Sequence, residues 1–143
     1  MQRKLFFILL LLSTLTMWAH DIEIDSIYYK IDPDTYTATV TYKGESYDYD
    51  LERSKDYVQI PDTIEYKSEY YAVKHVGSNA FRGCKNVRSV IIPNGVTSIG
   101  SSAFEDCSAM EYVEMPKTIK SIDYYAFSNC KFLQTVVIPD SIT

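Results

Sequence analysis

The stretch AFEDC at residues 103–107 decides the fold, because nearly the same phrase occurs 23 residues before it and 23 residues after it. The other two copies are AFRGC at residues 80–84 and AFSNC at residues 126–130. Self-similarity at a fixed period of this size is typical of solenoids, in which each repeat forms one coil and stacks on its neighbours. The sequence therefore predicts a short repeat solenoid.

The residues around the phrase recur with the same offset and give the unit L-x-x-V-x-I-P-x-x-V-x-x-I-G-x-x-A-F-x-x-C. Apolar residues at alternate positions, such as Val90 and Ile92, predict a short strand, which the following proline ends because it has no N–H to donate. Gly77 and Gly100 predict a tight bend, and Asp123 in the third copy is expected to use the left-handed conformation there. The Ala-Phe pair and the polar residues after it predict one helical turn on the opposite side of the coil.

Stacking is required because one coil buries too few side chains to offset the entropy of ordering its backbone. The equivalent residues Phe81, Phe104 and Phe127 are expected to form an internal aromatic ladder, with Cys84, Cys107 and Cys130 as a thiol ladder beside it. An odd number of cysteines at coil spacing favours free, buried thiols. Disulfides are the alternative, since the chain is expected to be exported.

The repeat resembles the leucine-rich repeats of the BspA-like family of bacterial surface proteins, which are marked by I-G-x-x-A-F-x-x-C-x-x-L-x-x-V-x-I-P at 23-residue spacing. The resemblance covers residues 57–143, about three and a half coils without a C-terminal cap. It implies an arc-shaped leucine-rich repeat solenoid with strands on the concave side and short helical turns on the convex side. It also implies adhesion to host matrix proteins or to another bacterial surface.

Residues 1–19 have the pattern of a secretory signal peptide. Arg3 and Lys4 precede the apolar run of residues 5–12, and Ala19 offers a small residue for cleavage, although Met17 leaves the exact site open. The run is too short for a transmembrane anchor, which needs about 20 apolar residues. We therefore expect a secreted, cell-surface or periplasmic protein.

The charge of the chain argues against two classes of partner. Its formal net charge is −5, and removal of residues 1–19 with their two positive charges changes this to −7. A surface with this balance disfavours nucleic acid and anionic membranes as partners.

Residues 20–56 differ from the repeats and predict an N-terminal β cap. Residues 26–31 and 36–42 have strand composition, with Asp32, Pro33 and Asp34 as turn residues between them, so a β-hairpin is expected. Such a hairpin would cover the open end of the first coil. The first coil is also longer than the others, because 32 residues separate Pro61 from Pro93, and the extra residues around EYKSEYY at 65–71 predict a protruding hairpin.

Two surfaces are candidates for binding. The first consists of the outward strand positions, which are mixed in character, so that a solvated face without a ligand is the alternative. These positions are Arg88, Ser89, Ile91, Glu111, Tyr112, Glu114, Gln134, Thr135 and Val137. The second includes Tyr66 and Tyr70, within a region that holds ten of the 13 tyrosines. Tyrosine suits binding surfaces, but it also suits strands, and the strand interpretation is favoured.

Catalysis is not expected. His20 and His75 form no metal pair, and His75 with Cys84 would be a nucleophile and base only if Cys84 lay outside the thiol ladder. The acidic residues of the cap lack the glycine-containing spacing of tight calcium loops, so no cofactor or metal is expected. These residues are Asp21, Glu23, Asp25, Asp32 and Asp34.

The last coil predicts a strand at residues 136–138 with an unpaired edge. Self-association through this edge is one expectation, and a longer repeat protein of which this chain is the N-terminal piece is the other. The sequence as a whole predicts an exported, non-enzymatic protein-interaction or adhesion module. The alternative is a structural segment with no ligand of its own, and the partner's identity and the oligomeric state stay open.

Overall fold

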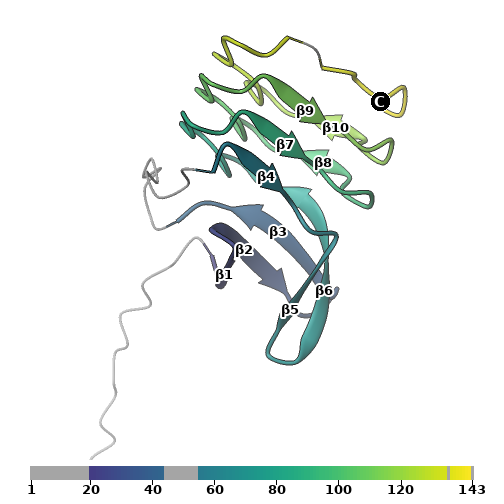
Figure 1. Cartoon of the computed structure of the whole chain (residues 1–143). Coiled ribbons are helices and arrows are strands. Elements are labelled where there is room, and N and C mark those ends of the chain that lie inside the picture. The colour runs from purple at the N-terminus through teal and green to yellow at the C-terminus, as the bar shows by residue number, and fades with distance from the viewer. Residues whose placement is uncertain (1–19, 44–54, 135, 143) are drawn as a thin grey trace, which may run out of the picture.

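The computed structural model describes residues 20–43, 55–134 and 136–142. These residues form ten strands and no helix (Figure 1). Over the described ranges no helix has the length and apolar character needed to cross a membrane. The predicted signal peptide at residues 1–19 and the candidate residue Thr135 lie outside the described residues.

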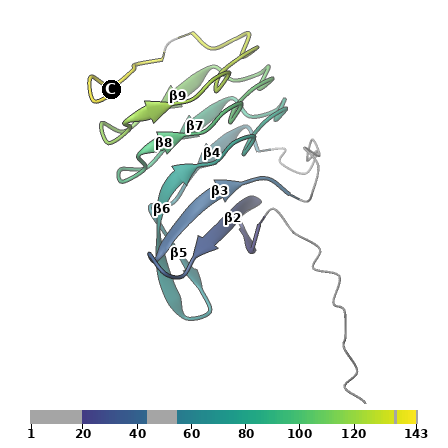
Figure 2. The same cartoon turned by 180° about the vertical axis from the view of Figure 1, so that it is seen from behind.

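The strands form two sheets. A seven-stranded sheet has the order β1-β2-β3-β6-β8-β10, with β5 paired to β6 as well. Its strands are β1 (Ile22–Ile24), β2 (Ile27–Asp32), β3 (Thr37–Thr41), β5 (Thr63–Tyr66), β6 (Glu69–Val76), β8 (Ser98–Ile99) and β10 (Ser121–Ile122). A three-stranded sheet contains β4 (Tyr57–Gln59), β7 (Ser89–Ile91) and β9 (Tyr112–Glu114). Figures 1 and 2 show these strands stacked along one axis.

The repeats of residues 89–99 and 112–122 each contribute one strand to each sheet, and the strands of successive repeats pair in parallel. Ser89 is the register partner of Tyr112, and Ser98 is the partner of Ser121. The strands predicted before Pro93 and Pro116 are present as β7 and β9. The second strand of each repeat, β8 or β10, was not predicted, because two residues are too few to display an alternating pattern.

The AF-x-x-C segments close the third side of each coil with a hydrogen-bond ladder of their own. Alternate N–H groups of each segment donate to carbonyls of the next coil. Between the first and second copies the pairs are Asn79 to Ser101, Phe81 to Ala103 and Gly83 to Glu105. Between the second and third copies they are Ser102 to Tyr124, Phe104 to Ala126 and Asp106 to Ser128. The intervening N–H groups, such as that of Cys84 to Phe81, stay within the turn. An α-helix would direct every N–H along its own axis. The predicted helical turn is therefore wrong.

Left-handed residues occur at two fixed positions of this segment. They are Asn79, Ser102 and Tyr125 at the first position, with φ of 61°, 57° and 59°, and Gly83, Asp106 and Asn129 at the second, with φ of 72°, 61° and 58°. The tight bend predicted at Gly77 and Gly100 is present, since the N–H groups of Ala80 and Ala103 donate to their carbonyls at 3.2 Å. The left-handed conformation expected for Asp123 is wrong, because its φ is not positive, and neither glycine has a positive φ. The two glycines meet the neighbouring backbone instead. A Cβ at Gly77 would lie 2.7 Å from the Val40 carbonyl oxygen, and one at Gly100 would lie 2.6 Å from the Ser78 nitrogen.

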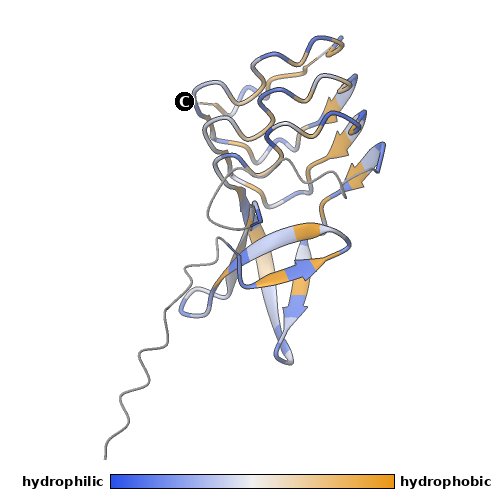
Figure 3. Ribbon diagram, turned by 90° about the vertical axis from the view of Figure 1, so that its left-hand side faces the viewer, coloured by the Kyte–Doolittle hydropathy of each residue, from blue (hydrophilic) through white to orange (hydrophobic). Residues whose placement is uncertain are grey.

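Stacked aromatic rings run through the centre of the coils. The Phe81 and Phe104 ring centroids lie 5.1 Å apart with an interplanar angle of 2°, and Phe104 and Phe127 lie 5.2 Å apart at 7°. All three cysteines are free; Cys84 and Cys107 are buried, and Cys130 is partly buried. Figure 3 shows the apolar parts of successive coils one above another. The phenylalanine column is thus a core element.

The N-terminal region joins this core edge to edge. The predicted hairpin is present as β2 and β3, paired antiparallel, and β1, which was not predicted, adds to the outer edge of β2. Strand β3 pairs in parallel with β6, which in turn pairs with β8. Tyr29 and Val40 belong to the same hydrophobic cluster as the repeats. One sheet therefore runs from the hairpin into the coils.

The protruding hairpin predicted at EYKSEYY is also present. Strands β5 and β6 pair antiparallel, and Lys67 and Ser68 form the turn with φ of 51° and 65°. Two positive φ values are characteristic of the tight turn that matches strand twist. In Figure 1 this hairpin projects from the end of the molecule opposite to the last coil.

The strand predicted at residues 136–138 is absent, so that prediction is wrong. The Gln134 N–H donates to the Glu111 carbonyl at 3.3 Å, but no described residue beyond it pairs with β9. Val137 is 73% exposed, and Ile138 and Phe132 are exposed as well. In place of a strand edge, this part of the last coil is a non-strand segment with exposed apolar side chains.

Candidate binding face

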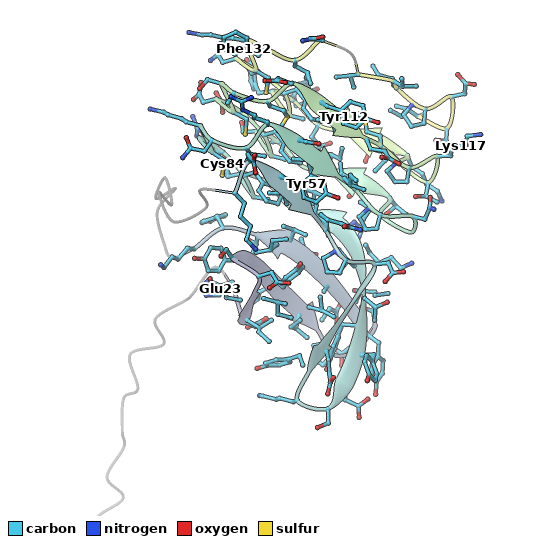
Figure 4. The ribbon with its side chains drawn as sticks, viewed as in Figure 1. Glu23, Tyr57, Cys84, Tyr112, Lys117 and Phe132 are labelled. Atoms are coloured by element: carbon cyan, nitrogen blue, oxygen red, sulfur yellow. The ribbon has the colours of Figure 1, made fainter. Side chains whose placement is uncertain are left out.

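The three-stranded sheet carries the first candidate surface, and its register places the residues in rows (Figure 4). One outward row holds Tyr57, Ser89 and Tyr112, and the other holds Gln59, Ile91 and Glu114. Between them the residues Val58, Val90 and Val113 point inward and are buried. This arrangement follows from the alternation of side chains along each strand.

Two tyrosine rings flank a serine on this face. Tyr57 is 45% exposed and Tyr112 is 49% exposed. Strands in a sheet lie about 4.8 Å apart, so the two tyrosines, on the first and third strands, have their Cα atoms about 10 Å apart. The Tyr57 hydroxyl donates to the Gln59 side-chain oxygen at 3.2 Å, which orients its ring.

Tyr57 was missed by the sequence reasoning. The long first coil took it out of the 23-residue frame on which the outward positions were counted. A usable signal exists, because YVQIP at residues 57–61 closely matches YVEMP at residues 112–116. Alignment on the proline alone would have found it.

A charged pair borders the tyrosines. Arg88 Nη1 lies 3.5 Å from Glu111 Oε1, and both side chains are exposed. An exposed pair of this kind contributes about 0.2–1 kcal/mol, so it mainly cancels charge at this edge. Glu114 and Gln134 are exposed as well, whereas Val137 lies on the segment that is not a strand.

Tyr66 and Tyr70 lie elsewhere. Both belong to the β5–β6 hairpin of the other sheet, so the structure does not bring them together with Tyr112. Tyr70 is exposed, but the Tyr66 ring packs edge-on against Tyr71, with centroids 6.3 Å apart. Tyr28, Tyr29 and Tyr71 are buried, which gives these tyrosines a core role.

A small pocket adjoins Tyr57 where the β1–β2 turn meets β4. Its volume is 210 Å³, and apolar residues such as Ile27 and Phe81 line it beside polar Asp25 and Lys55. Lys55 Nζ donates to the Asp25 carbonyl at 3.2 Å and ties the two segments together. Small-molecule sites usually measure about 300–1,000 Å³. This pocket is of a size for one inserted side chain.

The thiols of Cys107 and Cys130 are not set up as nucleophiles. Burial raises the pKa of Cys130 to about 11, and burial raises the pKa of the Cys107 thiol further, so both are protonated at neutral pH. His75 is exposed and its Nδ1 lies 2.8 Å from the Ser98 hydroxyl. Burial is the largest influence on the pKa of His20 and lowers it.

Two of the five carboxylates considered for calcium have structural partners. Asp32 accepts hydrogen bonds from the N–H groups of Asp34 and Thr35. The hydrogen bond with the Thr35 side chain is the main cause that lowers the pKa of Asp32. Asp21 pairs with Lys30 at 3.2 Å and accepts the Ile31 N–H at 2.7 Å. Over the described part of the chain, no three His, Cys, Asp or Glu residues are grouped so as to hold a metal.

The chain is similar to a known protein family and to several solved structures. Residues 55–143 match the BspA type leucine rich repeat region, in six copies. A leucine-rich repeat protein from Bacteroides ovatus is 33% identical with a TM-score of 0.74, over 86% of this chain and 30% of that one. One from Bacteroides capillosus is 29% identical with a TM-score of 0.72, over 85% and 83%. The Treponema pallidum leucine-rich repeat protein is 26% identical with a TM-score of 0.68, over 85% and 52%.

The chain thus spans less than a third of the Bacteroides ovatus protein and about half of the Treponema pallidum protein. No protein of curated function matches it.

Proposed function

The chain belongs to the BspA-type leucine-rich repeat family, and from that premise we propose that it is an exported, non-enzymatic module that binds a protein partner through the face of β4, β7 and β9. Leucine-rich repeats present extended surfaces for protein binding. The observation that carries the proposal is the pair of exposed rings, Tyr57 and Tyr112, on one sheet face. Export rests on the pattern of residues 1–19, and adhesion to matrix or bacterial surfaces on the family resemblance.

The chemistry of the face suits a protein better than other partners. Tyrosine combines a large apolar ring with a polar tip and is enriched at protein interfaces. The pocket beside Tyr57 offers a place for one anchoring side chain, as interface hot spots require. The net charge of −5 disfavours nucleic acid.

The test begins with capture of binding proteins from matrix extracts and bacterial surfaces, followed by measurement of affinity by surface plasmon resonance. Tyr57→Ala and Tyr112→Ala are each expected to weaken binding about 30-fold, the effect of losing about 2 kcal/mol at a hot spot. The pair Tyr112→Ala with Glu114→Ala tests the last strand of the face. Tyr124→Ala is the matched control, because Tyr124 is 83% exposed and lies outside the sheet.

Three results would contradict the proposal. Equal loss of affinity from Tyr124→Ala would move the site away from the sheet. Loss from Tyr70→Ala alone would move it to the β5–β6 hairpin. Binding to no protein by a correctly folded chain would favour the alternative of a structural segment without a ligand.

A further inference from the structure

A second surface lies at the corner where each coil passes from the three-stranded to the seven-stranded sheet. It is a groove of 570 Å³ that we call the lysine groove. Its lining residues are Lys74, Gly95, Thr97, Lys117, Thr118, Lys120 and Ser141. Three are cations and none is acidic, although the chain as a whole carries a net charge of −5. Lys117 stands at the tip of its coil, to one side of β9 in Figure 4.

Two of the lysines belong to one column that crosses three coils. The Thr97 N–H donates to the Lys74 carbonyl at 2.8 Å, and the Lys120 N–H donates to the Thr97 carbonyl at 2.8 Å. Thr97 therefore separates the two lysines, whose Cα atoms lie two strand spacings apart, or about 10 Å. The repeat sets this distance.

Local backbone geometry gives Lys74 its place. Ala38 pairs with Val73 and Thr39 pairs with His75, so Lys74 is the extra residue of a β-bulge in β6. Bulges re-aim a side chain. The Lys74 ammonium lies beside Gly95, since a Cβ at that glycine would be at an ordinary contact distance of 3.6 Å from Nζ.

The hydroxyl groups of the groove are already used. Thr97 Oγ1 donates to the Lys74 carbonyl at 3.3 Å, and Thr118 Oγ1 donates to the Val96 carbonyl at 2.7 Å. Ser141 Oγ lies 2.6 Å from the Ile119 carbonyl. None of the ion pairs formed within the described residues includes Lys74, Lys117 or Lys120. The donors that remain for a ligand are the three ammonium groups.

We propose that the lysine groove binds an extended acidic polypeptide segment with a carboxylate at every third residue. In the polyproline II conformation such carboxylates lie on one side of the chain about 9.3 Å apart. This is close to the distance of about 10 Å between the Cα atoms of Lys74 and Lys120. The absence of an aromatic residue among those that line the groove removes the usual platform for sugar rings. Asp140 occupies the position equivalent to Lys117 in the next coil and has the opposite charge. Lys74 and Lys120 therefore carry the recognition.

The test uses a synthetic peptide of repeated Glu-Pro-Pro and measures its binding by fluorescence anisotropy at about 0.01 M salt, where the Debye length is about 30 Å. Lys74→Gln and Lys120→Gln are each expected to weaken binding about twofold to fivefold, and together about 4-fold to 25-fold. The matched control is Lys85→Gln with Lys131→Gln, which removes the same charge at exposed positions outside the groove. Lys120→Arg should keep most of the affinity.

Several outcomes would overturn the proposal: an equal loss from the control pair, equal binding of a Gln-Pro-Pro peptide, or binding of a sulfated glycan but not of the acidic peptide. Tyr57→Ala with Tyr112→Ala should leave peptide binding unchanged. The lysine groove and the tyrosine face can therefore fail independently.

Discussion

The thiol of Cys107 donates a hydrogen bond to the carbonyl oxygen of Phe81, one coil earlier, at a distance of 3.1 Å. The thiol of Cys130 repeats the link to Phe104, also at 3.1 Å. The cysteine of each AF-x-x-C phrase therefore fastens its coil to the phenylalanine of the coil before it.

The buried Cys107 thiol should make the protein sensitive to alkali. Burial raises its pKa above the ordinary value of 9.0, so above pH 9 the unfolded thiol loses its proton while the folded one keeps it. The unfolded state is then favoured, and the free energy of unfolding should fall by about 2 kcal/mol between pH 9 and 11 from this group alone. Urea denaturation of wild type and Cys107→Ala across this range measures it. A constant difference between the two proteins would contradict the assignment.

Thiol labelling should distinguish the three cysteines. In the native protein Cys130 should react first, because it is only partly buried, whereas Cys84 and Cys107 are buried. In denaturant without reductant all three should react, since none forms a disulfide. Mass spectrometry after labelling counts them. Fewer than three labels on the unfolded chain would mean that the cysteines are not free.

Phe104→Ala should be among the most destabilising changes in the repeats. Its ring is fully buried and stacks on both Phe81 and Phe127. A loss of about 3–5 kcal/mol is expected from the removed contacts and the cavity left behind. Phe127→Ala is the matched comparison and should cost less, because the Phe127 ring stacks on one side among the described residues and is only partly buried. Equal losses in urea denaturation would count against the ladder as described.

Gly100→Ala should destabilise the protein by about 1–3 kcal/mol, because the new Cβ would lie 2.6 Å from the Ser78 nitrogen and the backbone would have to move. Asp123→Ala changes the equivalent position of the next coil, where a side chain already exists, and should alter stability by less than about 0.5 kcal/mol. Thermal unfolding of both variants provides the comparison. If Gly100→Ala proved neutral, the close approach of the coils would not explain this glycine.

The period of the sequence predicted most of the core. It placed Phe81, Phe104 and Phe127 in one column, because identical offsets must stack when coils are equal in length. It did not predict the backbone of the AF-x-x-C segment. Tyr125 adopts a left-handed conformation that its side chain does not favour, and only the ladder to neighbouring coils imposes it.

The candidate sites were predicted less well, for a related reason. Tyr57 and Lys74 both lie in the first coil, where the β5–β6 hairpin interrupts the period. Lys120 stands exactly two repeats beyond Lys74, but the bulge that brings Lys74 into the groove depends on its pairing with β3, which no local pattern of residues encodes. Surfaces built from several coils need the register before they can be recognised.

The alternating N–H groups of the AF-x-x-C segments give the stack a polarity. In the last coil the carbonyls of Tyr124, Ala126 and Ser128 accept from the coil below, whereas the N–H groups of Tyr125, Phe127 and Asn129 bond to no described residue. These three N–H groups are equivalent to the ones that donate to the next coil in the earlier repeats, so they form a row of donors on the last coil. Two such ends placed face to face would oppose donor to donor, so only a partner with a row of acceptors can continue the ladder.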